Sequence, residues 1–349
     1  MELKLLDTTL RDGSYVNNFG FSANDTFNIT RDLDEAGVDL IEVGHGVGLN
    51  ASNSGHGFAA EDDKTYMKSA AQAIKNAKWG MFAIPGICEL SHLDSCFDHN
   101  IGFLRFGVSI DNYDTVVPYI EKTKKNGVIA CVNFMKSYTK EPYLFERAAR
   151  KIASVGADYI YIVDSAGNMT PPTVRKYCER VQDLNIGFHA HNNLGLANAN
   201  ALMAESCGAQ IIDCSLQGMG RSSGNSVTEH FVAIMHREGK LKKIDLMKLL
   251  DLGQKQIRPR LNLNGHEALD LVAGYAGFHS SYMNRILDTA QEFEVDPRIL
   301  IIEVCKITQS DAPEKVVEKV AKILSSKSQS YKFKGVLNNI YSGNEQDKI

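Results

Sequence analysis

The chain has 349 residues, of which 44% are hydrophobic and 23% are charged. These fractions are typical of a folded globular protein, and they exclude collagen-like, coiled-coil and largely disordered chains. Because 38 basic residues face 42 acidic ones, the formal net charge is −4. No overall positive field therefore exists to hold a nucleic-acid backbone, and we expect no nucleic-acid partner.

The sequence also argues against a membrane or exported protein. Its longest apolar runs, such as residues 268–278, fall far short of the roughly 18 residues that a membrane span needs. The first ten residues carry acids at Glu2 and Asp7 and lack a basic-then-apolar leader pattern. Seven scattered cysteines without a CxxC pair read as reduced packing residues. We therefore expect a cytoplasmic protein.

Apolar segments rich in β-formers recur along the first 220 residues and predict eight strands. They cover residues 4–10, 38–43, 80–84, 103–110, 128–134, 159–163, 186–190 and 211–216. Segments with helical spacing lie between or after them and predict eight helices. These cover residues 24–36, 62–76, 89–99, 113–125, 143–155, 171–184, 196–207 and 227–238.

Eight β/α units in about 240 residues are typical of a (β/α)8, or TIM, barrel. The competing doubly wound sheet normally has a GxGxxG turn after its first strand, and this chain has TTLRDGS there. From residue 241 onward the pattern is helical, over 241–252, 267–273, 280–292, 297–307 and 313–324. We therefore predict an α/β fold with a barrel domain over 1–240 and a helical C-terminal domain over 241–349, whose end from residue 325 is polar and frayed.

Polar side chains gather where the predicted strands end, the edge at which (β/α)8 barrels carry their active sites. Arg11 and Asp12 follow the first strand, and the segment HAHNN closes the seventh, over 189–193. We take Ser165 and Asn225, which follow the sixth and eighth strands, as candidate substrate-binding residues.

His189 and His191 form the sharpest signal, because residues two apart on a strand point to the same face. Two imidazoles and one carboxylate are a common ligand set for a divalent ion, and Asp12 is the natural third ligand. The alternatives are a hydrogen-bonded core histidine and, for Asp12, a turn or helix-cap role.

Two arginines accompany this candidate metal site. Arg11 is costly to bury without an anion, so it either stabilises a reacting anion or forms a salt bridge with Glu42 or Asp164. Arg221 lies in the glycine-rich run 218–224, whose backbone N–H groups favour an anion. We predict a carboxylate or phosphate partner for Arg221, and a tight loop is the alternative reading of the glycines.

Three motifs carry a family resemblance: DTTLRDG at 7–13, HAHNNLG at 189–195 and GMGRSSGN at 218–225. Together they resemble the metal-dependent superfamily of hydroxymethylglutaryl-CoA lyase, 2-isopropylmalate synthase and 4-hydroxy-2-oxovalerate aldolase. Segments 43–58 and 268–282 are most similar to the 4-hydroxy-2-oxovalerate aldolase family, so the resemblance spans almost the whole chain.

The resemblance implies a lyase that cleaves the C3–C4 bond of a 4-hydroxy-2-oxo acid to give pyruvate and an aldehyde. Asp12, His189 and His191 would then bind Mn²⁺, Mg²⁺ or another divalent ion, and Arg11 would stabilise the enolate oxygen. The resemblance further implies that the helical domain docks an acylating aldehyde dehydrogenase, and we expect a homo- or hetero-oligomer.

The general base is where this chain departs from the family, which has histidine just after DGS where Tyr15 stands here. The family also uses a C-terminal tyrosine, and this chain offers Tyr275 and His279, with His279 at the family's tyrosine position. Because a tyrosine with a pKa of about 10 is a poor base, we predict that Tyr15 positions the substrate hydroxyl and His279 removes its proton. A core or interface role is the alternative for His279. Arg221 and Ser222 also replace smaller residues of the family, and with Tyr15 they predict a substrate with extra negative charge or a larger polar aldehyde portion.

Three other functions remain open from the sequence. A Claisen-type condensation of an acyl-CoA with a 2-oxo acid would release free thiol, whereas an aldolase releases pyruvate. A two-histidine, one-carboxylate site also occurs in iron oxygenases, although the β/α alternation argues against that class. The fourth hypothesis is a catalytically degenerate barrel that serves as a scaffold for a dehydrogenase.

Overall fold

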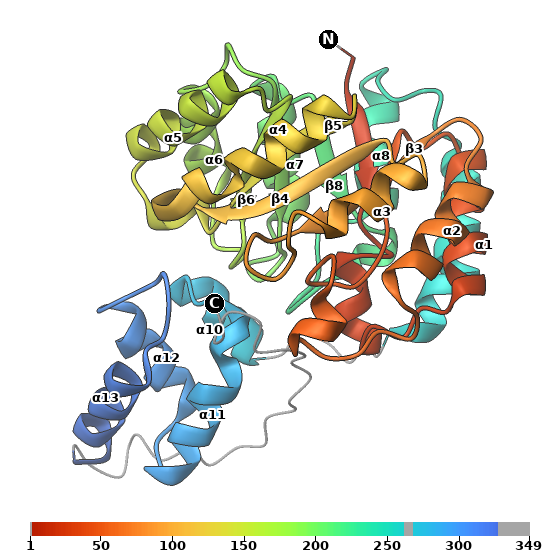
Figure 1. The fold of residues 1–349 in the computed structure, drawn as a ribbon. Helices are drawn as coiled ribbons and strands as arrows, with labels where there is room; N and C mark the ends of the chain where they lie inside the picture. Colours follow the sequence, from red (N-terminus) through yellow and green to blue (C-terminus); the bar gives the residue numbers. More distant parts are fainter. Residues whose placement is uncertain (1, 262–267, 327–349) are drawn as a thin grey trace.

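Eight parallel strands close into a barrel whose neighbours follow chain order in the computed structural model, which describes residues 2–261 and 268–326 (Figure 1). The strands are β1 (Lys4–Asp7), β2 (Leu40–Glu42), β3 (Lys78–Ala83), β4 (Phe103–Ser109), β5 (Ile129–Met135), β6 (Tyr159–Asp164), β7 (Ile186–Ala190) and β8 (Ile211–Cys214). Parallel pairing of β1 with β8 completes the ring. The predicted TIM barrel is therefore confirmed, and the doubly wound sheet is excluded.

Helices follow the strands and surround the barrel, as the periodicity predicts. They are α1 (Ala23–Glu35), α2 (Asp63–Ala73), α3 (His92–Asp98), α4 (Val117–Lys125), α5 (Pro142–Val155), α6 (Pro171–Cys178), α7 (Ala197–Ser206) and α8 (Thr228–Arg237). A capping box fixes the start of α1, because the Ser22 hydroxyl accepts from the Asp25 N–H and the Asp25 carboxylate accepts from the Ser22 N–H.

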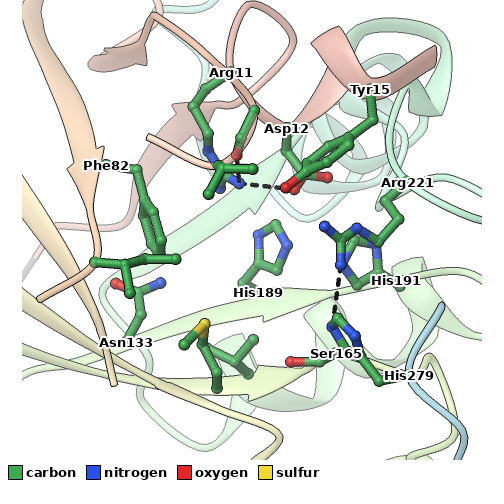
Figure 2. A pocket seen from close by; sticks show the side chains of 15 residues that line it. Arg11, Asp12, Tyr15, Phe82, Asn133, Ser165, His189, His191, Arg221 and His279 are labelled. Atoms are coloured by element: carbon green, nitrogen blue, oxygen red, sulfur yellow. Dashed lines mark hydrogen bonds and ion pairs between the residues drawn. The ribbon is translucent and has the colours of Figure 1, made fainter. Parts of the chain in front are cut away.

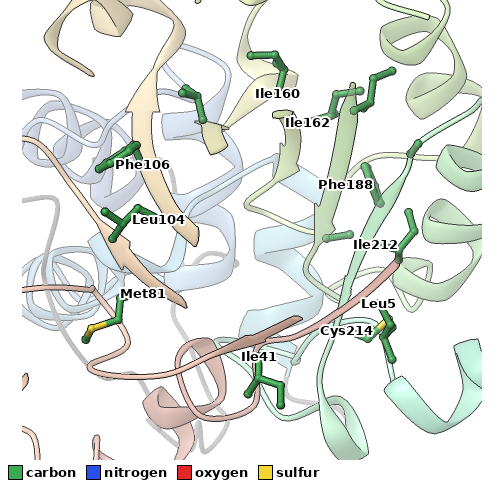
Figure 3. Close-up of a cluster of buried hydrophobic side chains, with 14 of the residues drawn as sticks. Leu5, Ile41, Met81, Leu104, Phe106, Ile160, Ile162, Phe188, Ile212 and Cys214 are labelled. Atoms are coloured by element: carbon green, nitrogen blue, oxygen red, sulfur yellow. The ribbon is translucent and has the colours of Figure 1, made fainter. Parts of the chain in front are cut away.

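Alternation along each strand separates two apolar layers. Side chains such as Ile41, Phe188 and Ile212 point outward and pack against the helices (Figure 3). Side chains such as Leu6 and Tyr161 point inward and form a separate buried cluster. Gly187 makes room for the Tyr161 ring, because a Cβ there would lie 2.3 Å from a ring atom. Two residues beyond Gly187, the same alternation turns His189 into the barrel.

Several predicted elements differ at their ends, and two of the differences have a visible structural reason. The first strand ends at Asp7 instead of residue 10, because the chain then turns into a short 3-10 helix, Asp12–Asn17, that brings Asp12 and Tyr15 over the barrel. The helix predicted over 113–125 begins as a 3-10 helix, Ile110–Val116, and becomes α4 only at Val117.

The described residues after the barrel are mostly helical. Helix α9 (Leu246–Leu252) packs into the barrel's core, whereas α10 (Ala268–Ala276), α11 (Met283–Glu292), α12 (Pro297–Cys305) and α13 (Glu314–Ser326) enclose a second core (Figure 1). The barrel core extends to Ile257 and the second core begins at Leu269, so we propose a domain boundary between these residues in place of residue 240. Most of the expected frayed end lies outside the described residues.

All seven cysteines are free thiols, and six of them are buried. In the described ranges 2–261 and 268–326, no helix combines the length and the apolar character that crossing a membrane requires.

Candidate active site at the barrel mouth

A pocket opens where the strands end, and most of the predicted site residues line it (Figure 2). Asp12, His189 and His191 lie together there, each buried, and each offers a ligand atom within 4.8 Å of the others. The two histidine rings are 5.2 Å apart between centroids. The grouping expected from the HxH pattern is thus present in the folded chain.

The chemistry of these side chains fits a divalent cation. His189 is held through its Nδ1, which lies 2.9 Å from an Asp213 carboxylate oxygen, so its Nε2 is the nitrogen available for an ion. Burial lowers the pKa of His191 to about 3, which keeps this imidazole neutral and able to act as a ligand. Its Nδ1 is buried without a hydrogen-bond partner among the described residues. Burial alone would raise the pKa of Asp12, but charge interactions, first of all with Arg11, outweigh it and lower that pKa, so Asp12 stays ionised.

Arg11 is buried and bound by two carboxylates. Its Nε donates to Glu42 at 2.6 Å and its Nη1 donates to Asp12 at 2.7 Å. Burial opposes its charge, but Glu42 and Asp12 more than compensate and raise the pKa of the guanidinium. Of the two salt-bridge partners considered from the sequence, the structure selects Glu42. Arg11 also lines the pocket, so this salt bridge is compatible with a role toward a reacting anion.

A chain of buried charges continues beneath the metal ligands. The Glu42 oxygen that accepts from Arg11 also accepts from Arg105 Nη1 at 2.9 Å. Arg105 in turn donates to the same Asp213 oxygen that contacts His189. Asp12 and His189 are therefore connected through four alternating charges inside the barrel, and the ring of Tyr161 lies 4.4 Å below the Arg105 guanidinium.

A second polar group forms one corner of the pocket and joins the barrel to the helical region. The Arg221 guanidinium lies 4.2 Å from the Tyr15 ring centroid. Its Nη1 is 3.3 Å from His279 Nε2 and 3.0 Å from the Ser281 hydroxyl. The Ser281 hydroxyl also lies 2.7 Å from His279 Nδ1. Arg221, Tyr15 and His279 therefore meet at the pocket, as Figure 2 shows.

Burial and charge define the protonation of this corner. Burial, followed by the positive charges of Arg221 and Lys136, lowers the pKa of His279 well below its ordinary value, so the ring is neutral. Burial raises the pKa of Tyr15, so its hydroxyl stays protonated and can donate a hydrogen bond. A neutral imidazole can accept a proton, whereas this tyrosine cannot act as the base.

The remaining candidates differ in position. Ser165 lines the pocket, and its hydroxyl accepts from the Lys136 N–H at 2.9 Å. Asn225 instead donates from Nδ2 to Asp12 at 2.8 Å, so it orients a candidate metal ligand. Gly220 allows this approach, because a Cβ there would lie 2.5 Å from the Asn225 amide carbon. Tyr275 is 72% exposed and does not line the pocket, because α10 turns it outward.

Sequence reasoning missed Arg105 and Asp213. Both lie within strands that read as apolar runs, FLRFGVS and IIDC. A charged residue in such a run predicts a buried partner of opposite sign, and that signal was present in the sequence. The apolar pocket wall of Val47, Phe82 and Met135 was missed as well, because apolar residues carry no distinctive motif.

Comparison with known proteins now adds to this geometry. The HMGL-like family model matches residues 2–255. The chain belongs to the HMGL-like family. A 4-hydroxy-2-oxovalerate aldolase of Carboxydothermus hydrogenoformans is 35% identical over 330 residues, which are 93% of this chain and 98% of that protein. The resemblance to the 4-hydroxy-2-oxovalerate aldolase family is thereby confirmed.

Two further relatives show how broad the family is. An oxaloacetate decarboxylase of Mycobacterium tuberculosis is 34% identical over 82% of this chain and 86% of its own length. The carboxyl transferase domain of Rhizobium etli pyruvate carboxylase has a TM-score of 0.73 at 14% identity, over 93% of this chain and 60% of that one. The second likeness concerns the fold alone.

Proposed function

We propose that this HMGL-like protein is a lyase, a divalent-metal-dependent aldolase that cleaves a 4-hydroxy-2-oxo acid into pyruvate and an aldehyde. The observation that carries the proposal is the meeting of Asp12, His189 and His191 beside Arg11 at the mouth of the barrel. Relatives named aldolases over nearly the full chain length support it.

Asp12, His189 and His191 would hold the ion, with Mn²⁺ or Mg²⁺ as our proposal. When bound, such an ion would act as a Lewis acid toward the developing negative charge, worth several kcal/mol in the transition state. Asp213 keeps His189 in one tautomer, and Asn225 keeps Asp12 oriented, so the ligands are preorganised.

The protein's own groups account for charge and proton movement. When the C3–C4 bond breaks, negative charge develops on the pyruvyl oxygens, and the permanently charged Arg11 stabilises it. We propose that His279 accepts the proton of the 4-hydroxyl group and that Tyr15 positions this group by donating a hydrogen bond. Protonated His279 then returns a proton to C3 of the enolate, which gives pyruvate and restores the neutral imidazole. The apolar side chains of Val47, Phe82 and Met135 line the same pocket and strengthen charge interactions there by lowering the local polarity.

Pyruvate release tests this function directly. The enzyme is incubated with a panel of 4-hydroxy-2-oxo acids and Mn²⁺, and pyruvate is followed through lactate dehydrogenase and NADH. We expect metal-dependent release that EDTA abolishes. No release from any member, with free-thiol release from acetyl-CoA and a 2-oxo acid instead, would favour the condensing enzyme.

Oxaloacetate belongs in the same panel, because one relative is named a decarboxylase. Loss of carbon dioxide from oxaloacetate needs no base for a 4-hydroxyl group, so the His279→Ala variant separates the two activities. Turnover of oxaloacetate that is insensitive to this change, without aldol cleavage by the parent enzyme, would identify a decarboxylase. If the protein binds a dehydrogenase partner but neither binds metal nor turns over a substrate, the scaffold hypothesis is supported instead.

We propose the helical region as the docking site for an acylating aldehyde dehydrogenase. Its exposed apolar side chains include Tyr275, Ile307 and Ile323, which are 72%, 62% and 44% exposed. Co-elution of the aldolase with such a dehydrogenase on gel filtration tests this, and the same column reports the oligomeric state. The cytoplasm is the compartment we propose.

A further inference from the structure

We propose that Arg221 selects substrates whose aldehyde portion carries an anionic group, a carboxylate or a phosphate. This inference rests on the proposed function and names the substrate class of that same site. It concerns the part of the substrate that leaves as the aldehyde, which the metal ligands and Arg11 do not define.

Arg221 is held in the pocket in one orientation. Stacking on Tyr15 at 4.2 Å fixes the plane of the guanidinium, and the contact with the Ser281 hydroxyl at 3.0 Å fixes one edge. A third contact joins its Nη1 to His279 Nε2 at 3.3 Å. A rigid guanidinium presents several N–H donors that match the oxygens of a carboxylate or phosphate, and little side-chain entropy remains to be lost on binding.

The two pocket arginines, Arg11 and Arg221, lie in different parts of the pocket. The guanidinium of Arg11 is bound by Glu42 and Asp12 and belongs to the buried charge chain. Arg221 lies on the other side of Asp12 and Tyr15 in the view of Figure 2. With the pyruvyl portion at Asp12, His189 and His191, the proposed position of the aldehyde portion is the part of the pocket that Arg221 lines.

A second cation adds to the positive potential at this corner. Lys136 follows the pocket residue Met135, and its Nζ donates to the Ser310 carbonyl at 2.7 Å. The same Nζ donates to the Tyr282 hydroxyl at 3.1 Å, and its charge acts on His279 together with that of Arg221. Two cations near one end of a partly enclosed pocket favour an anionic ligand group there.

Matched substrate pairs test the inference. The dianion 4-hydroxy-2-oxoheptanedioate yields succinate semialdehyde, and its partner 4-hydroxy-2-oxoheptanoate yields butanal from a chain of equal length. The second pair is 4,5-dihydroxy-2-oxopentanoate with and without a 5-phosphate. We compare kcat/KM within each pair for the parent enzyme, Arg221→Ala and Arg221→Lys, with Arg180→Ala on the outside of the barrel as a control.

We expect the parent enzyme to favour the anionic member of at least one pair by about tenfold to a hundredfold, as a charge-assisted hydrogen bond supplies. Arg221→Ala brings this ratio close to one, Arg221→Lys restores part of it, and Arg180→Ala leaves it unchanged. The pair that shows the preference identifies whether Arg221 recognises a carboxylate or a phosphate. A parent enzyme that prefers the neutral members, or a ratio that Arg221→Ala leaves unchanged, overturns the inference.

A binding measurement separates this inference from the proposed function. The acids 2-oxoheptanedioate and 2-oxoheptanoate lack the 4-hydroxyl group and cannot undergo aldol cleavage. Calorimetric titration in the presence of Mn²⁺ should show tighter binding of the diacid to the parent protein and no such difference in Arg221→Ala. Equal affinities overturn the inference even if cleavage is observed, and a diacid preference supports it even if cleavage is absent.

Discussion

Charged side chains make different contacts in the barrel interior and in the pocket corner made by Tyr15, Arg221 and His279. Inside the barrel, Arg11, Glu42, Arg105 and Asp213 alternate in sign and contact each other, and all are buried. At the corner, the Arg221 guanidinium lies against a tyrosine ring, a neutral imidazole and a hydroxyl.

We infer from this difference which part of the site serves all substrates and which part distinguishes among them. A closed set of buried charges has little freedom to change, because removing one member leaves another uncompensated at a cost of about 3–5 kcal/mol. It suits the metal and pyruvyl chemistry that every substrate shares. Within the corner, we propose that Tyr15 and His279 serve the 4-hydroxyl group that every substrate carries, and that Arg221 recognises the variable aldehyde portion. Five predictions test this division.

The largest effect is expected from Asp12→Asn, which removes the anionic ligand while keeping the side chain's shape. Metal binding and pyruvate release should both fall by about a thousandfold or more, the equivalent of several kcal/mol. Calorimetric titration with Mn²⁺ measures the first and the coupled assay measures the second. Full turnover in this variant would show that the ion is not held by Asp12.

Arg11→Lys should lower kcat by about 10²–10³-fold, because one ammonium cannot contact Glu42 and Asp12 while also stabilising developing charge. Steady-state kinetics at saturating metal measure this effect. The surface variant Arg150→Lys, in an exposed ion pair with Asp183, serves as the control. A raised KM with unchanged kcat would assign Arg11 to ground-state binding instead.

Asp213→Asn should weaken Mn²⁺ binding by about 10–100-fold, because His189 loses the carboxylate that orients it. Arg105 loses a partner in the same variant, so the melting temperature falls as well. Titration well below that temperature separates the two effects. Asp183→Asn, on the protein surface, should change neither quantity and serves as the control. Unchanged metal affinity in Asp213→Asn would show that the chain of buried charges does not support metal binding.

Arg221→Ala should change the pH profile of cleavage. Burial first, and then the charges of Arg221 and Lys136, lower the pKa of His279, and a base works only above its pKa. Removing the Arg221 charge raises that pKa, so activity on the neutral substrate is lost at a higher pH than in the parent enzyme. The acid limb of kcat against pH measures the shift, and a limb that stays in place would exclude His279 as the base.

The smallest effect is expected from Tyr275→Ala. Its side chain is exposed and outside the pocket, so kcat and KM should stay within about twofold of the parent values. A loss of activity in the isolated enzyme would restore Tyr275 as a catalytic residue.

The barrel and its metal ligands could be predicted because their signals are local. Apolar strands recur at regular spacing, and the HxH pattern fixes both imidazoles on one face through the two-residue period of a strand. The meeting of Asp12 with these histidines then follows from closure of the ring, since β1 pairs with β8 and β8 pairs with β7.

The corner and the charge chain could not be predicted in the same way. Glu42, Arg105 and Asp213 come from three strands, and their contacts depend on the stagger of strands around the ring, which no local pattern encodes. The meeting of Arg221 with His279 depends on how the helical region docks against the loop after β8. Tyr275 and His279 lie four residues apart in sequence, yet a turn after α10 sends only His279 into the pocket.

The most direct test of the account is a crystal structure of the protein soaked in Mn²⁺, with data collected at the manganese absorption edge. The account predicts an anomalous peak bonded to Asp12, His189 and His191, at the pocket that Arg11 and Arg221 line. Absence of a peak at full soaking, with Asp12 turned away from the two imidazoles, would contradict it.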